Sequence, residues 1–134
     1  MKRHSKDEYK PGPRFIRPIP RGTDLIRFIR AVCREKGIET ASFWILGSVS
    51  TATIGVYDPK QQVFVTHIEK EATEIISCMG HLSQTQGSSR VTAKIILATS
   101  NGHLTGGHLF PDTLAYHAEL DIQSLAGEPI KVDE

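Results

Sequence analysis

The feature that most constrains the fold is a single change in the spacing of apolar residues along the chain. Between Leu25 and Val32 apolar residues recur at intervals of three and four, the spacing of one helix face. From residue 41 onward they come in short runs separated by glycine, proline, asparagine and aspartate, a pattern typical of strands and turns. The sequence therefore predicts one helix followed by a sheet.

The helix is predicted over residues 23–36. Thr23 is a candidate N-cap, and Gly37 is a typical residue at which a helix stops. The apolar stripe of this helix is expected to cover the sheet. The opposite face carries three arginines: Arg27, Arg30 and Arg34.

About seven strands are predicted after the helix, with a short edge strand at most over residues 15–19. Gly47-Ser48 is interpreted as a break, and the run before it as a fully buried central strand. One helix cannot cover both faces of such a sheet, so we expect an α+β homo-oligomer. The predicted strands span residues 41–47, 51–57, 63–68, 73–82, 91–99, 104–110 and 113–122.

Length and composition favour one ordinary globular domain. The chain has 134 residues, of which 39% are hydrophobic and 23% charged. It has no long uninterrupted apolar run, no apolar block near its start and only two cysteines, which predicts a cytoplasmic protein with no membrane segment. We expect a flexible basic tail over residues 1–12, the domain over 13–126 and a C-terminal tail over 127–134.

Charge is distributed unevenly between the two parts of the chain. Residues 1–36 hold eleven Lys and Arg against four Asp and Glu, whereas the remainder holds five against eleven. This asymmetry can mark a face for an anionic partner such as DNA, although a solvated basic helix face and tail explain it more simply. The candidate DNA-binding residues are Lys2, Arg3, Lys6, Lys10, Arg27, Arg30 and Arg34.

An ordered set of motifs resembles the plant-and-prokaryote-conserved (PPC) domain in its prokaryotic single-domain form. The resemblance covers residues 14–126 and implies a homotrimer built on a mixed, mainly antiparallel sheet. In plants this domain follows an Arg-Gly-Arg-Pro DNA-binding hook, which this chain lacks. The motifs are Arg21-Gly22-Thr23-Asp24-Leu25, Leu46-Gly47-Ser48-Val49, the segment 74–83, the segment 102–109, and Ala118-Glu119-Leu120.

The resemblance also bears on metal binding. Prokaryotic members often carry His-x-His on the strand before Gly-Gly-His, and the three imidazoles can hold a metal. Here the matching strand has Thr92-Ala93-Lys94, and a lysine ammonium cannot ligate a cation. We therefore expect no metal and no cofactor.

Two registers are open for the hairpin around Asn101-Gly102. A two-residue turn would place His108 opposite Ile95, which hydrophobic patterning slightly favours. A three-residue loop with Gly102 left-handed would place His108 opposite Lys94. We favour the second register, because the histidines of the family converge only there.

In that register a ligand pocket forms around His108 if the sheet brings the candidate residues together, whereas the interpretation we favour is a partly exposed Lys94–Glu119 ion pair with the histidines in polar packing. No nucleophile–base pair or phosphate-binding loop is recognisable, so no catalytic residue is assigned. The leading hypothesis is a non-enzymatic homotrimeric regulatory module that binds DNA weakly, in a salt-dependent way, or binds a protein partner. The competing hypothesis is a small-ligand protein or metal-assisted enzyme. The candidate ligand-binding residues are Thr92, Lys94, Gly106, Gly107, His108, His117 and Glu119.

Overall fold

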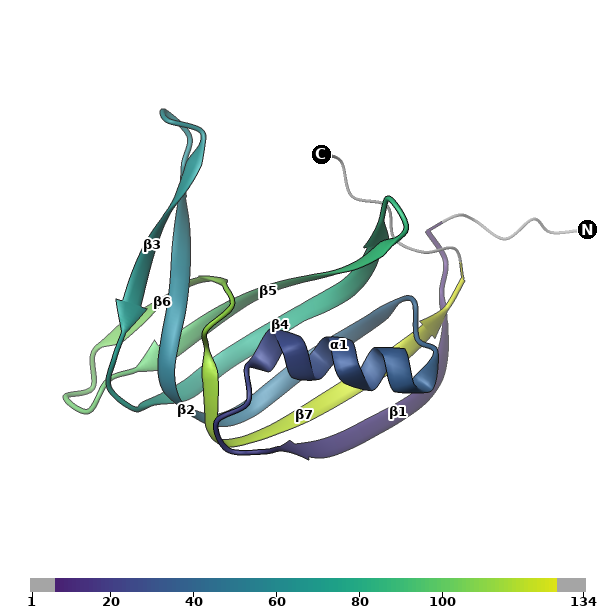
Figure 1. Cartoon of the computed structure of the whole chain (residues 1–134), viewed down its shortest axis with the longest axis horizontal. Coiled ribbons are helices and arrows are strands. Elements are labelled where there is room, and N and C mark those ends of the chain that lie inside the picture. The colour runs from purple at the N-terminus through teal and green to yellow at the C-terminus, as the bar shows by residue number, and fades with distance from the viewer. Residues whose placement is uncertain (1–6, 128–134) are drawn as a thin grey trace, which may run out of the picture.

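The computed structural model describes residues 7–127, which form one helix and seven strands (Figure 1). The helix crosses one face of a large curved sheet, as the sequence predicts. The elements are β1 (Lys10–Ile19), α1 (Leu25–Lys36), β2 (Ala41–Asp58), β3 (Val63–Glu69), β4 (Thr73–Thr85), β5 (Ser88–Ala98), β6 (Leu104–Leu109) and β7 (Leu114–Ala126).

The sheet has the strand order β1-β7-β2-β4-β5-β6, and every pairing between the described strands is antiparallel. β2 pairs with β7 and then β6 along one edge, and with β4 and then β3 along the other. Because β5 joins β4 to β6, the strands β2, β4, β5 and β6 close a ring. The β2–β3 hairpin projects away from the rest of the sheet (Figure 1).

Asp24 is the N-cap of α1, so the prediction of Thr23 is wrong by one residue. The Asp24 carboxylate accepts hydrogen bonds from the backbone N–H groups of Arg27 at 2.9 Å and Asp112 at 2.7 Å. The Thr23 carbonyl instead accepts from Ala115 of β7, which holds Thr23 outside the helix. At the other end Gly37 has a φ of 66°, the left-handed conformation common after helices.

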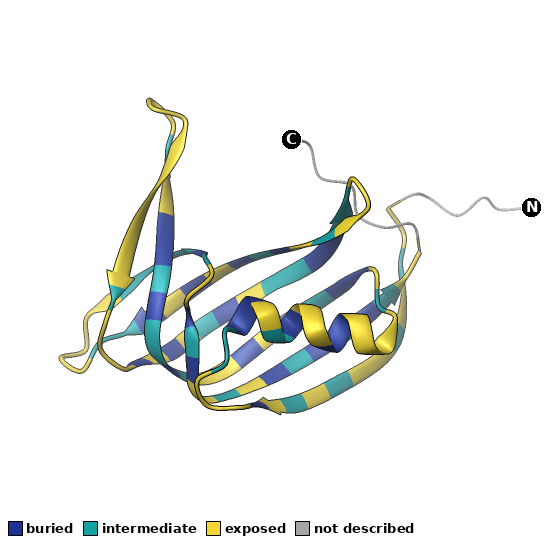
Figure 2. Ribbon diagram, in the orientation of Figure 1, coloured by how far each residue is buried: buried dark blue, intermediate teal, exposed yellow. Residues whose placement is uncertain are grey.

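The apolar stripe of α1 packs on the inner face of the sheet, and this contact forms the core. Leu25 and Ile29 are fully buried, and so are Phe43 and Leu120 on the strands beneath them. In Figure 2 the buried positions alternate along the strands under the helix, while the outward side of α1 is exposed. Burial of these side chains out of water is the main stabilising contribution.

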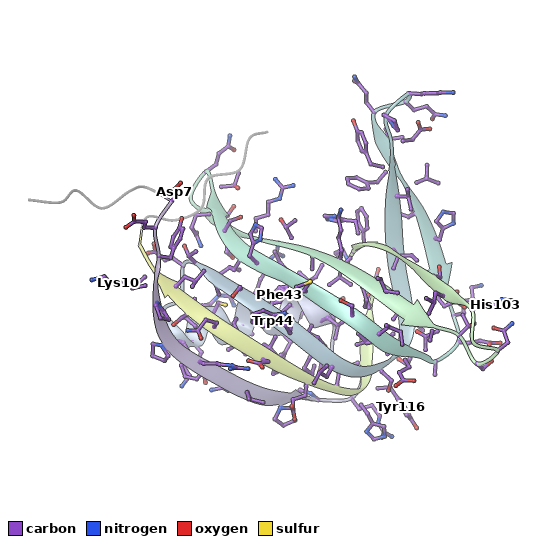
Figure 3. All side chains as sticks on the ribbon, turned by 180° about the vertical axis from the view of Figure 1, so that it is seen from behind. Asp7, Lys10, Phe43, Trp44, His103 and Tyr116 are labelled. Carbon is purple, nitrogen blue, oxygen red and sulfur yellow. The ribbon has the colours of Figure 1, made fainter. Side chains whose placement is uncertain are left out.

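The face of the sheet away from α1, called here the outer face, is uncovered. The prediction of a fully buried strand over residues 41–47 therefore holds for one side only, because Trp44 and Leu46 are 41% and 64% exposed. Figure 3 views this face, with Trp44 near its centre. One row of directly paired residues crosses it from β1 to β6: Ile16, Asp121, Trp44, Met79, Lys94 and His108.

The predicted break at Gly47-Ser48 is wrong, because β2 continues through it. Gly47 has a φ of 119° and marks a bulge between the pairings of β2 with β4. A Cβ atom at Gly47 would overlap the carbonyl oxygen of His117 on β7. The glycine thus lets two strands approach closely where an ordinary residue would separate them.

Two other boundaries differ from the prediction. The loop predicted over residues 84–89 shrinks to the pair Gln86-Gly87 between β4 and β5. β1 begins at Lys10 and is longer than the edge strand expected over residues 15–19. Its prolines are tolerated because β1 pairs only with β7 and forms a free edge of the described sheet.

Candidate functional site

The β5–β6 hairpin adopts the register with the three-residue loop. Thr99 donates its backbone N–H to the carbonyl of His103 at 2.8 Å, and Gly102 between them has a φ of 83°. Lys94 consequently lies directly opposite His108. This confirms the favoured register and excludes the pairing of His108 with Ile95.

His108 is a half-buried side chain beside two aromatic rings. Its ring centroid lies 5.0 Å from that of Phe64 and 5.3 Å from that of Phe110. Burial lowers the pKa of His108 from its ordinary value, and the positive charges of Arg90 and Lys94 lower that pKa further. The imidazole is therefore neutral at pH 7 and stands in an electropositive environment.

Gly106 and Gly107 allow neighbouring strands to approach closely. A Cβ atom on Gly107 would lie 2.5 Å from the carbonyl oxygen of Gly55 on β2. One on Gly106 would overlap the carbonyl oxygen of Ile95 on β5. Both glycines thus serve the closure of the β2–β4–β5–β6 ring.

The seven candidate ligand residues fall into two groups within one chain. Thr92, Lys94 and His108 lie on the β5–β6 end of the outer face, whereas His117 and Glu119 lie on β7. Since β2 and β4 separate β7 from β5, Lys94 and Glu119 are about 14 Å apart along the sheet, three strand spacings. Neither ion pair found between residues 7 and 127 joins them.

The β7 group lines a cavity of about 510 Å³ that the sequence analysis did not assign. Arg21 contacts the Nε2 atom of His117 at 3.0 Å, and its guanidinium lies 4.3 Å from the ring centre of Tyr116. Glu119 and Leu46 complete the wall. Arg21 belongs to the motif Arg21-Gly22-Thr23-Asp24-Leu25, but only the fold shows that its side chain reaches β7.

Among the predicted DNA-binding residues, the arginines of α1 lie on the other side of the sheet from these two groups. Arg27, Arg30 and Arg34 are exposed along the solvent side of α1, and Lys10 is exposed at the start of β1. Neither ion pair of the described chain, Arg14–Asp121 or Arg17–Glu35, uses them. Three further candidates lie outside the described residues: Lys2, Arg3 and Lys6.

The residues at the family's metal position do not fit a metal ion. Lys94 faces His108 directly, and its ammonium would repel a cation held there. Among residues 7–127 there is no group of three or more His, Cys, Asp or Glu side chains placed to hold one. The absence of a bound metal stays a prediction.

The fold and these motifs together define a PPC-type domain. The chain belongs to the Plants and Prokaryotes Conserved (PCC) domain family, whose match spans residues 6–126. No significant match was found among curated proteins. Within the described part of the chain, no helix is both long and apolar enough to cross a membrane.

Three solved structures illustrate the likeness. A plant- and prokaryote-conserved protein from Pyrococcus horikoshii superposes with a TM-score of 0.90 at 28% identity, covering 96% of this chain and 89% of its own. A metal-containing protein from Archaeoglobus fulgidus superposes with a TM-score of 0.87 at 31% identity, covering 92% of this chain and 87% of its own. A Bacteroides thetaiotaomicron protein, which has been proposed to bind DNA, gives 0.78 at 22% identity, covering 87% and 83%, and shares the fold.

Proposed function

We propose that this chain is a non-enzymatic, homotrimeric PPC-domain protein that acts as a DNA-associated regulatory module. The observation that carries the DNA part is the row of exposed arginines on α1, Arg27, Arg30 and Arg34. Arginines that lack carboxylate partners can contact phosphates without first breaking an ion pair. Three copies of the row would multiply a weak attraction. The DNA binding proposed for a fold relative supports the same conclusion.

The trimer is supported by the exposed outer face. Apolar side chains from four strands, among them Ile16, Leu46 and Ile96, are more than 40% exposed there. A contiguous apolar surface of this kind is uncommon on a protein that remains monomeric. Light scattering should give three times the 14.8 kDa of the chain. A mass that stays near one chain at every concentration would exclude the trimer.

The DNA part is tested by titrating a fluorescent duplex with the protein at low salt. We expect a dissociation constant of about 10⁻⁴ to 10⁻⁶ M that weakens steeply as salt is added, because phosphate contacts release counterions. The triple variant Arg27→Gln/Arg30→Gln/Arg34→Gln should bind more weakly and with a shallower salt dependence.

The control removes two exposed charges elsewhere, with Lys60→Gln and Lys70→Gln. This control should bind the duplex as the parent protein does. Binding that salt does not weaken, or a loss in the control as large as that in the arginine variant, would contradict a role for the α1 arginines.

Small-ligand binding is a second candidate function, favoured by the cavity beside β7. Arg21 there donates to the Nε2 atom of His117 and has further guanidinium N–H groups next to the aromatic face of Tyr116, which are donors suited to a small oxyanion. Calorimetric titration with phosphate is the test, and heat that Arg21→Gln abolishes would support it. Equal heats in both proteins would remove this candidate.

A further inference from the structure

We propose that Lys94 of one copy pairs with Glu119 of the next copy, so that the two separated groups of site residues meet between subunits. This inference rests on the homotrimer of the proposed function and identifies an ion pair between its subunits. The occupant of the outer face is therefore a second copy of this chain.

The first support is the separation of charge across the outer face. The β5–β6 end carries the cations Arg90 and Lys94, and neither belongs to an ion pair between described residues. The β7 end carries the carboxylates Asp121 and Glu119, beside Arg14 and an Arg21 that lies against His117 and Tyr116. Asp121 already accepts two hydrogen bonds from Arg14, at 2.7 and 2.5 Å, so Glu119 is the carboxylate there with no ion-pair partner among the described residues.

The second support is the apolar surface between these two ends. Trp44 and Leu46 on β2, with Met79 on β4 and Ile96 on β5, are 41% to 64% exposed and lie between Glu119 and Lys94. Burial of this surface would supply most of the affinity, while the charges at its two ends would fix the orientation of the copies.

Opposite charges at opposite ends specify how the copies are arranged. In a threefold ring each copy presents two different patches, one to each neighbour. The β5–β6 end of one copy then meets the β7 end of the next, and the contact repeats three times. Glu74 on β4 lies on a strand between the two ends, where it is paired with Ser48 of β2 and Ala98 of β5.

A zero-length carbodiimide cross-linker tests the contact in the unmodified protein, because it joins an amine to a carboxylate only where they touch. The experiment mixes ¹⁴N- and ¹⁵N-labelled protein, exchanges the subunits, cross-links them and analyses tryptic peptides by mass spectrometry. We expect a peptide pair joined through Lys94 and Glu119 with one light and one heavy half. About 14 Å along the sheet prevents this link within one chain.

Two conservative variants serve as controls. Lys94→Arg keeps the charge but forms no amide, so the cross-linked pair should disappear while the trimer remains. Glu119→Gln should also remove the pair. A trimer that never yields the pair from the unmodified chain would overturn the proposed contact and leave the proposed trimer intact, whereas a monomeric parent protein would overturn the trimer itself.

Charge reversal gives an independent test of the same contact. Lys94→Glu and Glu119→Lys should each raise the concentration at which the trimer dissociates by at least about tenfold, because like charges then face each other at three junctions. The double variant should recover most of this loss. The controls Arg30→Glu and Glu71→Lys change exposed positions away from the outer face and should dissociate as the parent does. Single reversals that behave like these controls would overturn the pairing.

Discussion

The side chain at position 94 decides whether the β5–β6 hairpin can accept a cation. Lys94 is paired directly with His108 across the hairpin, and its positive charge lowers the pKa of the imidazole. Two unit positive charges about 4 Å apart repel by about 4 kcal/mol at an effective dielectric of 20. A single substitution at this position thus changes the chemistry of the whole hairpin, although the backbone register stays the same.

The double variant Thr92→His/Lys94→His should create a zinc site. Residue 92 lies two positions along β5 from residue 94 and on the same face, so three imidazoles would converge at distances that Zn²⁺ requires. Metal analysis after dialysis should find zinc in the double variant. Thr92→Gln/Lys94→Gln removes the lysine without adding ligands and should stay metal-free. A folded double variant without zinc affinity would contradict this geometry.

The titration of His108 should respond to Lys94. Removal of the ammonium in Lys94→Gln should raise the pKa of His108 toward its ordinary value without restoring it, because burial is the larger cause of the shift. NMR titration of the imidazole resonances measures this change. Lys60→Gln, in the turn between β2 and β3, is the control and should leave the pKa of His108 unchanged.

The lowered pKa of His108 also makes the stability of the folded chain depend on pH in a definite direction. A histidine whose pKa is lower in the folded chain binds its proton more readily when unfolded, so it costs stability as pH falls below about 6.5. Lys94→Gln should therefore lose less stability than the parent between neutral and mildly acidic pH. An equal acid loss in both proteins would show that Lys94 does not act on His108.

At the scale of the elements, the ring of strands closes through two glycines. Gly55 on β2 and Gly107 on β6 bring their backbones together, and no side chain fits between them. Phe110 fills the space on the other side of Gly55. The junction between β2 and β6 therefore depends on missing side chains as much as on the aromatic residues that surround it.

Gly107→Val should destabilise the domain by about 1–3 kcal/mol, the usual cost of forcing extra atoms into a packed contact. Urea unfolding followed by circular dichroism measures the change. Gly102→Asn is the control, since nothing lies within 4 Å of a Cβ there and asparagine tolerates positive φ. Equal stability of Gly107→Val and the parent would show that the strands can separate without loss.

Local sequence signals predicted most of the helix and strands, but not which strands lie next to one another in the sheet. The register of the β5–β6 hairpin could be predicted from Gly102, because the length of a loop and the residues that face each other across it depend on a few adjacent positions. Gly47 led to a wrong prediction, since a β-bulge and a break between two strands both favour glycine. The separation of Glu119 from Lys94 follows from β2 and β4 lying between their strands, and strand order is not encoded in spacing along the chain.

At the scale of the whole molecule, the two faces are suited to different partners. The arginines of α1 point away from the outer face, because the helix lies on the opposite side of the sheet (Figures 1 and 3). Association of copies through the outer face would therefore leave every α1 surface open. In the proposed assembly, trimer formation and DNA contact do not compete for the same residues.

Trp44, the single tryptophan of the chain, should report on this assembly. It is partly exposed at the centre of the outer face, and a second copy would remove it from water. Dilution of the trimer should shift its emission to longer wavelength and increase quenching by acrylamide, at the concentrations where light scattering shows dissociation. Constant emission across a measured dissociation would place the interface elsewhere.

The position of β2 has a consequence for how the chain acquires its structure. β2 pairs with four other strands, and β7, the last element made, inserts between β2 and β1. Ala41 pairs with Leu82 of β4 on one side, but finds its β7 partner on the other side only when Ser124 has been synthesised. Contacts so distant in sequence slow folding, since a long loop must close before they form. A ribosome-bound chain keeps β1, and the edge of β2 that faces β7, unpaired until β7 has emerged, which makes its synthesis the period of greatest exposure to aggregation.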